Sequence, residues 1–588
     1  MIWNFATISL IVIVNILLPS SGTSLVTLNF YNDTGAVKYF LNGTNLANLP
    51  YKFIDRDILR KAIFRAGRGL SVSRTCINGN KNSKTVDEQE EKLSYFREDV
   101  ALNLHHSIWH IIHPVDPHHI GSLVPTHSDR RGELFGYMHS QLLARYNFAR
   151  INERMSEVSP LENLQDRLPG FYNPMVDYSQ GVPYSARGEG VLIKDFIYDE
   201  TDGTRSKVTV EKLQLYIERI QNSIKSNTIN INGTEIRESN NTYIDILGNI
   251  VEACSKTVNR EYYGNLHNYI HRAISFANRP DRIKQIGMGV IGDTNTAVRD
   301  PIFYRLHATT ERLFRQHKDL LSPYSVEELS FDGVFLTDVI IKPAQVNHRI
   351  AKAFGDNVLV TFWEESIIDI TKGMSFAPTF PIKVCHRHLQ HVPFSYEITV
   401  DNYSGKPLKG TARIFMAPTN DGMDIYLNFE KQRKLFVEMD KFVVNLKPGV
   451  NYIKRESLTS TVASPANLTL HFPPNPSMEW TAEQKFELSR VIYRGCGWPH
   501  HLLIPKGRSD GLGAHLFVMI SDYGRDKVKE LADVDHESGN SLCGLNGKLY
   551  PDRRPMGFPF DRKAKACDIF DFLTPNMIVK IVNITHVE

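Results

Sequence analysis

The chain has 588 residues, of which 42% are hydrophobic and 23% are charged. This length exceeds what a single hydrophobic core supports, so we expect roughly two to four domains. Lys and Arg total 68 against 65 Asp and Glu, and this near balance argues against nucleic acid or an anionic membrane surface as the partner.

The first 24 residues have the layout of a secretory signal peptide. An apolar run from Ala6 to Leu18 is followed by small residues, although no Lys or Arg precedes it. No later segment has the ~18 unbroken apolar residues that a membrane-spanning helix needs. We therefore expect a secreted protein. N-glycosylation sequons, which suit that location, occur at Asn32, Asn42, Asn232, Asn240, Asn402, Asn467 and Asn583.

The hydrophobic pattern divides the rest of the chain into three parts. Residues 25–93 are mixed and end in a polar run, NGNKNSKTVDEQEEK. In residues 94–370 apolar residues recur at helical spacing in several segments, which predicts a mostly helical domain. Residues 371–588 change to short alternating runs separated by turn residues, as in FSYEITVDNYSGKPLKG. This pattern predicts an antiparallel β-sandwich or barrel, so the expected fold class is multidomain α + β.

The helical part carries two histidine pairs with the same spacing. In NLHHSIWH and in GNLHNYIH two histidines lie four residues apart, so on a helix each pair shares one face and can reach one metal ion. Each pair is followed by a single histidine on a further predicted helix. The two resulting sets are His106, His110 and His139, and His267, His271 and His307.

One such pair alone often occurs by chance on a solvated helix face, but two pairs with matching third histidines are hard to explain in that way. We therefore predict a binuclear metal site inside a helical bundle. Imidazole ligands without thiolate suit copper, iron or zinc, so spacing leaves the metal open. His105 points about 100° away from His106 and is not expected to be a ligand. His500 and His501 are expected at the surface.

Several segments resemble the copper-site segments of the arthropod hemocyanin and prophenoloxidase superfamily. They are YFREDVALNLHHSIWHIIHP, DRRGELFGYMHSQLLARYNF, YYGNLHNYIH and TAVRDPIFYRLH, and the resemblance runs from about Tyr95 to near the C-terminus. It implies a type 3 centre of two copper ions and an immunoglobulin-like C-terminal sandwich. The first copper would be held by His106, His110 and His139, and the second by His267, His271 and His307. All six residues are present, which argues against the hexamerins, storage relatives that have lost copper ligands.

Within this superfamily, GCGWPHHLLIPKG and YPDRRPMGFPFDR resemble the prophenoloxidase versions of these segments. The resemblance implies a phenoloxidase that uses O2 to oxidise o-diphenols, and to hydroxylate monophenols, giving o-quinones for melanin-type chemistry. A hemocyanin-like oxygen carrier and a catalytically retired secreted relative are the alternatives. No acid stands near Ala297, where some relatives carry one, and Asp300 is better explained as a helix cap, so the catalytic base stays unknown.

The cysteines and the N-terminal part depart from the family pattern. Arg494 and His536 replace two cysteines that relatives pair with each other, and the resemblance implies that the retained pair forms one disulfide, Cys496–Cys543. Residues 25–93 are shorter than the helical first domain of relatives, which supplies a phenylalanine that covers the copper site. We expect that this plug is missing. A leader with a shortened first domain suggests hemolymph, or a gland or venom secretion, as the location. The resemblance also makes a homo-oligomer and an activating protease expected partners.

Overall fold

The computed structural model describes most of the chain from residue 87 onward. The described residues are 62, 77–78, 84–85, 87–115, 129–173, 176–177, 182–199, 205–278, 287–344, 354–371, 381–469 and 481–588. The predicted signal peptide and nearly all of the predicted N-terminal region lie outside them. None of the helices in the described ranges is both long and apolar enough to cross a membrane.

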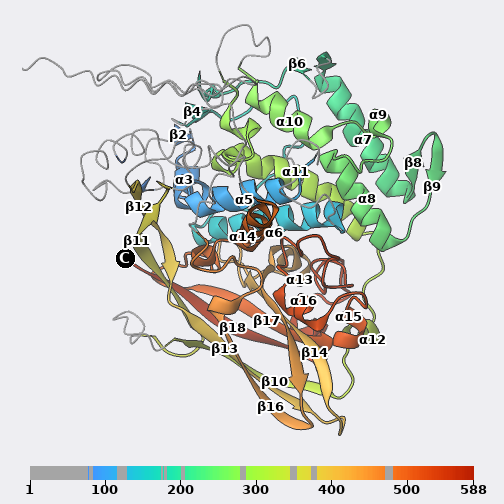
Figure 1. Cartoon of the computed structure of the whole chain (residues 1–588), viewed down its shortest axis with the longest axis vertical. Coiled ribbons are helices and arrows are strands. Elements are labelled where there is room, and N and C mark those ends of the chain that lie inside the picture. Colours follow the sequence, from blue (N-terminus) through green and yellow to red (C-terminus); the bar gives the residue numbers. More distant parts are fainter. Residues whose placement is uncertain are drawn as a thin grey trace, which may run out of the picture.

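Helices dominate the described chain up to residue 329, and β-strands dominate after it (Figure 1). The α-helices are α3 (Glu88–Glu91), α4 (Ser94–Arg97), α5 (Val100–Ile112), α6 (Arg131–Asn152), α7 (Val210–Ser226), α8 (Asn240–Glu252), α9 (Arg260–Tyr263), α10 (Leu266–Ser275), α11 (Pro301–Lys318), α12 (Val326–Leu329), α13 (Phe429–Gln432), α14 (Ala482–Gly495), α15 (Tyr523–Asp526) and α16 (Asp533–Ser538). The strands are β1 (Ile77–Asn78), β2 (Lys84–Thr85), β3 (Phe171–Tyr172), β4 (Val176–Asp177), β5 (Val182–Pro183), β6 (Phe196–Asp199), β7 (Arg205–Val208), β8 (Ile229–Ile231), β9 (Thr234–Ile236), β10 (Val334–Pro343), β11 (Val358–Asp369), β12 (Lys383–His391), β13 (Phe394–Asn402), β14 (Leu408–Pro418), β15 (Val437–Leu446), β16 (Gly449–Glu456), β17 (Leu512–Asp522) and β18 (Met577–Val587).

Helices α5 and α11, which carry three of the six predicted ligands, begin at side-chain caps. Asp99 accepts a hydrogen bond from the backbone N–H of Leu102 at the start of α5, and Asp300 accepts one from Ile302 at the start of α11. Pro301 then occupies the first helical position, where its missing N–H costs nothing. Asp300 is therefore a helix cap, as the sequence predicted.

Helices α6 and α8 cross with their backbones in contact. A Cβ atom built on Gly248 would lie 1.9 Å from the carbonyl oxygen of Gly132, and a Cβ atom on Gly132 would lie 1.9 Å from that of Asp245. The Asp245 carboxylate also accepts a hydrogen bond from the N–H of Gly132, at 2.7 Å. Only glycine permits this approach, and it fixes the position of α6 relative to α8.

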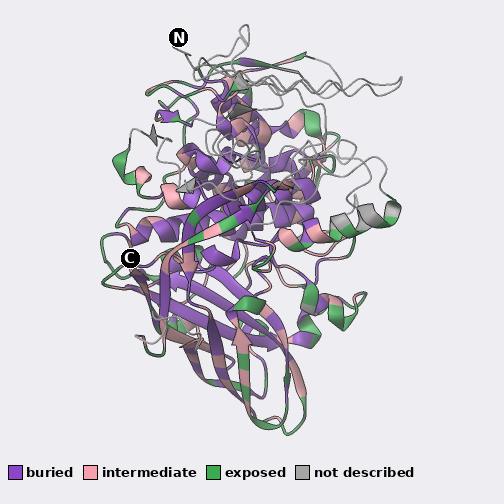
Figure 2. Cartoon of the chain, turned by 60° about the vertical axis from the view of Figure 1, so that its left-hand side comes forward, coloured by how far each residue is buried: buried purple, intermediate pink, exposed green. Residues whose placement is uncertain are grey.

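The β region is built from two sheets. One has seven strands in the order β1-β12-β11-β18-β17-β14-β15, and the other has three in the order β10-β13-β16. Most pairings are antiparallel, as predicted, but β1 with β12 and β11 with β18 are parallel. Apolar side chains from both sheets form one core, and the helices form a second, shown as the buried interior in Figure 2.

The predicted boundary after residue 370 falls later than the start of the sheets. Strands β10 and β11 precede it and pair with β13, β12 and β18. Their segments, VFLTDVIIKP and VLVTFWEESIID, are rich in β-branched and aromatic residues, which favour a pleated, half-buried surface. The β region therefore begins about 40 residues earlier than we expected.

Candidate metal centre

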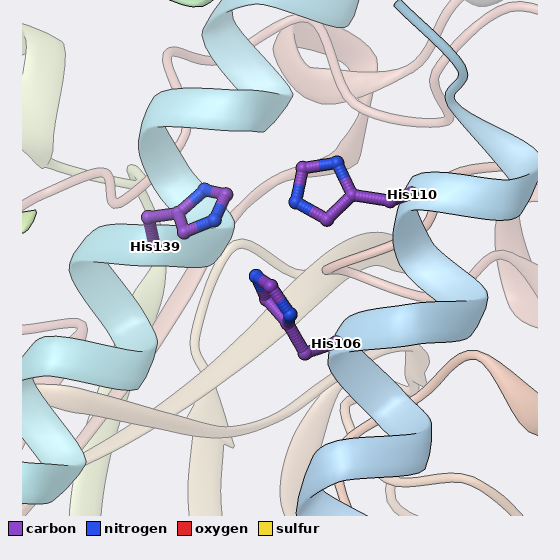
Figure 3. Close-up of side chains that lie close together, drawn as sticks. All are labelled: His106, His110 and His139. Atoms are coloured by element: carbon purple, nitrogen blue, oxygen red, sulfur yellow. The ribbon is translucent and has the colours of Figure 1, made fainter. Parts of the chain in front are cut away.

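The first predicted triad comes together between α5 and α6. His106 and His110 lie one helical turn apart on α5, with ring centroids 4.7 Å apart. The His139 ring on α6 lies 5.7 Å from each of them. Figure 3 shows the three imidazoles pointing toward one another. One ring nitrogen from each lies within 4.8 Å of the others, a spacing that suits one metal ion.

The second triad forms in the same way from α10 and α11. The His267 and His271 rings lie 4.5 Å apart on α10, and the His307 ring on α11 lies 5.1 Å and 5.6 Å from them. The Nε2 atoms of His267 and His271 are 3.1 Å apart. Their potential ligand atoms also lie within 4.8 Å of one another.

The two triads face each other inside the bundle. The His139 and His307 rings stack in parallel with centroids 4.2 Å apart, which joins the two sets. Phe303 lies one turn before His307, with its ring 4.2 Å from His307 and 5.2 Å from His106. The fold therefore places six imidazoles from four helices around one interior space, as the sequence predicted.

Backbone carbonyl groups fix the orientation of three of these rings. The Nδ1 atoms of His106, His139 and His271 donate to the carbonyl oxygens of Thr294, Phe135 and Ile291, at 2.7, 2.9 and 2.7 Å. Because a carbonyl oxygen only accepts, each of these Nδ1 atoms carries the proton. Nε2 is then the unprotonated nitrogen, free to bind a metal ion.

The electrostatics of the site favour neutral imidazole, the form that binds metal. Burial lowers the pKa of His106 and of His271 to about 4. Burial also lowers the pKa values of the other four well below their usual range, and neighbouring imidazoles lower them further: His110, His139, His267 and His307.

The donor set fits bound metal at two of its ring nitrogens. Within the described chain, Nε2 of His139 and Nε2 of His307 are buried without a hydrogen-bond partner. A buried nitrogen left unpaired costs roughly 1–3 kcal/mol, and metal coordination would satisfy both. The residues present therefore fit a pair of metal ions held by imidazole.

The remaining residues near the two triads take structural positions. His105 is buried, donates from Nδ1 to the carbonyl of Cys496 and packs on Trp498, and it belongs to neither triad. Trp109 is buried core and donates to the carbonyl of Leu542 at 2.9 Å. Ala297, at the position where some relatives carry an acid, is buried.

Our prediction that His500 and His501 lie at the surface is wrong. They are 5% and 3% exposed, and His501 Nε2 lies 2.9 Å from the carboxylate of Asp99, which caps α5. His388 on β12 packs on the His501 ring at 4.5 Å. Asp99 and His388 lie about 400 and 113 residues before His501, so no local pattern could show the burial.

The predicted disulfide is confirmed, since Cys496 and Cys543 are bonded, with Cα atoms 6.2 Å apart. Cys254 and Cys567 are free. The bond joins two segments of the β region that both lie against α5, through the carbonyls that accept from His105 and Trp109.

The fold and the site define a binuclear, histidine-ligated metalloprotein with a C-terminal β-sandwich. Family models match in two blocks: the copper-containing domain of hemocyanin over residues 48–314, and the hemocyanin immunoglobulin-like domain over residues 323–586. The chain belongs to the hemocyanin family, whose members include the phenoloxidases. Its centre is accordingly a binuclear type 3 copper centre.

Phenoloxidases and a hemocyanin both resemble this chain. It is 40% identical over 503 residues to "Phenoloxidase 2" of Holotrichia diomphalia, which covers 85% of this chain and 71% of the relative. It is 38% identical over 553 residues to "Phenoloxidase 3" of Drosophila melanogaster, covering 91% and 76%. It is 36% identical over 538 residues to the "Hemocyanin AA6 chain" of Androctonus australis, covering 90% and 80%.

Two solved structures share the fold. The crystal structure of a crustacean hemolymph-type prophenoloxidase matches with a TM-score of 0.78 and 26% identity, covering 92% of this chain and 77% of that one. Scorpion hemocyanin in its activated state matches with a TM-score of 0.76 and 33% identity, covering 95% and 84%.

Proposed function

We propose that the chain is a copper-dependent phenoloxidase that oxidises o-diphenols to o-quinones with O2. The observation that carries this proposal is the pair of facing histidine triads, one from α5 and α6 and one from α10 and α11. The similarity to several phenoloxidases supports the oxidase activity over other uses of the same site.

The proposal assigns three histidines to each copper ion. The first copper is assigned to His106, His110 and His139, and the second to His267, His271 and His307. When bound, the copper pair supplies the two-electron redox chemistry that couples phenol oxidation to reduction of O2. The chain holds the imidazoles neutral by burial, and the bonds from Nδ1 to backbone carbonyls direct Nε2 inward.

Diphenol oxidation is the better-supported half of the reaction. Hydroxylation of a monophenol first requires loss of the phenol proton, and a nearby carboxylate would serve as the base. Of the two acids close in sequence, Asp300 caps α11 and binds Arg187 through both oxygens, at 2.6 and 2.8 Å. Asp293 accepts from the hydroxyl of Tyr184 at 2.8 Å. Both are engaged structurally, so we propose o-diphenols as the preferred substrates.

An oxygen carrier is the second candidate, since the hemocyanin of Androctonus australis is 36% identical over 538 residues. A catalytically retired relative is the third. A carrier would bind O2 reversibly without consuming it in the presence of a catechol. A retired relative would bind no copper or show neither behaviour.

The deciding experiment is O2 consumption by the purified, copper-loaded chain with a catechol and then a monophenol, before and after limited proteolysis. We expect rapid uptake with the catechol. His307→Gln should abolish uptake and lower the copper content. His317→Gln is the matched control, because His317 is buried on the same helix but packs on Tyr243 at 4.5 Å, outside both triads. Two bound copper ions without net uptake in either state would refute the oxidase proposal.

We also propose that the protein acts outside the cell. The leader-like N-terminus and the exposed sequon at Asn232 support this, as does the hemolymph-type prophenoloxidase among the similar structures. Secretion by expressing cells, followed by glycosidase treatment, would test it. An activating protease and self-association remain proposals, tested by the proteolysis arm above and by sedimentation.

A further inference from the structure

One buried carboxylate lies against the metal centre and is not part of either triad. Glu252, the last residue of α8, is 0% exposed, and its Oε1 atom lies 3.7 Å from Nδ1 of His110. Of the six histidines, His110 has a carboxylate within ion-pair distance of its ring nitrogen.

The two oxygens of this carboxylate have different surroundings. Oε2 forms an ion pair with Arg131, which also donates to the carbonyl of His113 at 2.7 Å. Oε1 is buried and has no hydrogen-bond partner among the described residues. An unpaired buried carboxylate oxygen is costly, so a donor at this position would stabilise it. His110 Nδ1 is such a donor at 3.7 Å, and shortening this distance to a charge-assisted bond of about 2.8 Å requires a shift of under about 1 Å.

The carboxylate differs in kind from the acceptors used elsewhere in the site. His106, His139 and His271 donate to neutral backbone carbonyls, and Nδ1 of His267 lies 3.4 Å from the side-chain oxygen of Asn268. A carboxylate is a stronger acceptor than a carbonyl oxygen, and it increases the basicity of the ligand that donates to it. This makes the first site chemically different from the second.

We propose that Glu252 is a positioning residue for the first copper: its Oε1 accepts the Nδ1 proton of His110, and this holds Nε2 toward the metal and raises the copper affinity of that site. The inference rests on the proposed assignment of His110 as a ligand. Arg131 balances the negative charge, so the carboxylate can stay ionised while buried.

The test measures copper retention rather than activity. Wild-type chain and Glu252→Gln, each loaded with two copper ions, are titrated with a chelator while bound copper is quantified. We expect Glu252→Gln to lose one copper at a 10–100-fold lower chelator concentration and to hold the other as wild type does. Glu98→Gln is the matched control. Glu98 is also buried and pairs with a buried arginine, Arg299. Glu98→Gln should therefore lower the free energy of unfolding without changing the chelator concentration at which either copper ion is lost.

Two further variants separate the carboxylate from its ion pair. Arg131→Met breaks the same pair but keeps the carboxylate, so we expect a smaller loss of copper than in Glu252→Gln. If Glu252→Gln does not fold, the double variant Glu252→Gln/Arg131→Met removes both charges, and its copper loss is compared with that of Arg131→Met. Half-site variants assign the effect: Glu252→Gln should weaken copper binding in a His271→Gln background, where only the first triad is complete.

The outcomes distinguish this inference from the function on which it rests. Wild-type chain that fails to hold two copper ions overturns both. Wild-type chain with two, and Glu252→Gln with an unchanged titration at both sites, overturns the role of Glu252 alone. Copper loss in Arg131→Met equal to that in Glu252→Gln would likewise overturn it, because the ion pair, and not the acceptor for His110, would then govern the site.

Discussion

Replacing Gly248 by alanine should separate α6 from α8 and disturb the first copper site. The two backbones touch at this point, with a Cβ on Gly248 only 1.9 Å from the carbonyl oxygen of Gly132 and 2.2 Å from its carbonyl carbon. His139 lies seven residues beyond Gly132 on the same helix, about two turns away. A displacement of α6 is therefore carried to the ligand.

Two opposing effects decide the size of the change. Alanine is favoured over glycine in a helix interior by about 1 kcal/mol, so without the close contact the substitution would stabilise α8. Contacts under 3.0 Å do not occur for real Cβ atoms, so the helices must move apart by about 1 Å. Overpacking of this kind costs roughly 1–3 kcal/mol, and the upper end applies because backbone atoms cannot rotate away. We expect a net loss of about 2 kcal/mol in the free energy of unfolding.

The assay combines denaturant unfolding of the apoprotein with copper stoichiometry. Gly248→Ala should unfold at lower denaturant and retain less copper than wild type. Gly355→Ala is the control, because no atom lies within 4 Å of the position that its Cβ would take and its backbone is not left-handed. A Gly248→Ala protein as stable as wild type, with two copper ions bound, would show that the helix contact does not position the site.

Three further predictions concern the rest of the molecule. Burial lowers the pKa of His500 to about 4, so as the pH falls the unfolded chain takes up this proton before the folded chain does. The free energy of unfolding should therefore decline between about pH 6.5 and 4. His500→Gln should make this decline shallower when unfolding is measured as a function of pH. Cys496 and Cys543 close a loop of 47 residues, so replacing both by serine should lower the free energy of unfolding by about 4 kcal/mol by the chain-entropy relation. Denaturant unfolding measures this loss, and an unchanged midpoint would contradict the prediction. Asn232 is exposed in a tight turn whereas Asn402 is 0% exposed with its amide bonded to two carbonyls, so glycopeptide mapping of secreted protein should find a glycan on the first and none on the second.

The sequence predicted what depends on local periodicity. Histidines four residues apart share a helix face wherever that helix is packed, so both pairs could be recognised before any tertiary structure was known. The cap of α11 was predicted for the same reason, because Asp300 and Pro301 act within one turn. The third member of each triad was predicted from a single histidine on a further predicted helix, and the resemblance to a known family implied the same two sets.

What the sequence did not reveal depends on contacts between distant segments. Glu252 stands at the end of a helix with no motif around it, and its importance follows only from its distance to His110. The burial of His500 and His501 is of the same kind. The strands at 334–369 were missed for another reason. The boundary between the helical and the β part was placed after residue 370, so these strands were assigned to the helical part although their own composition favours strands.

Helix α5 shows why the β region belongs to the metal centre. It carries His106 and His110, and other residues along its length are held by long-range contacts of the β region. Asp99 at its start meets His501, His105 and Trp109 donate to the carbonyls of Cys496 and Leu542, and His113 at its end lies 3.1 Å from the carbonyl of Cys543. The disulfide ties these anchoring segments to each other. Because all of these residues belong to one helix, the positions of His106 and His110, the two proposed copper ligands, depend on residues about 400 positions away. A change in the sandwich can therefore alter the metal site without touching a ligand.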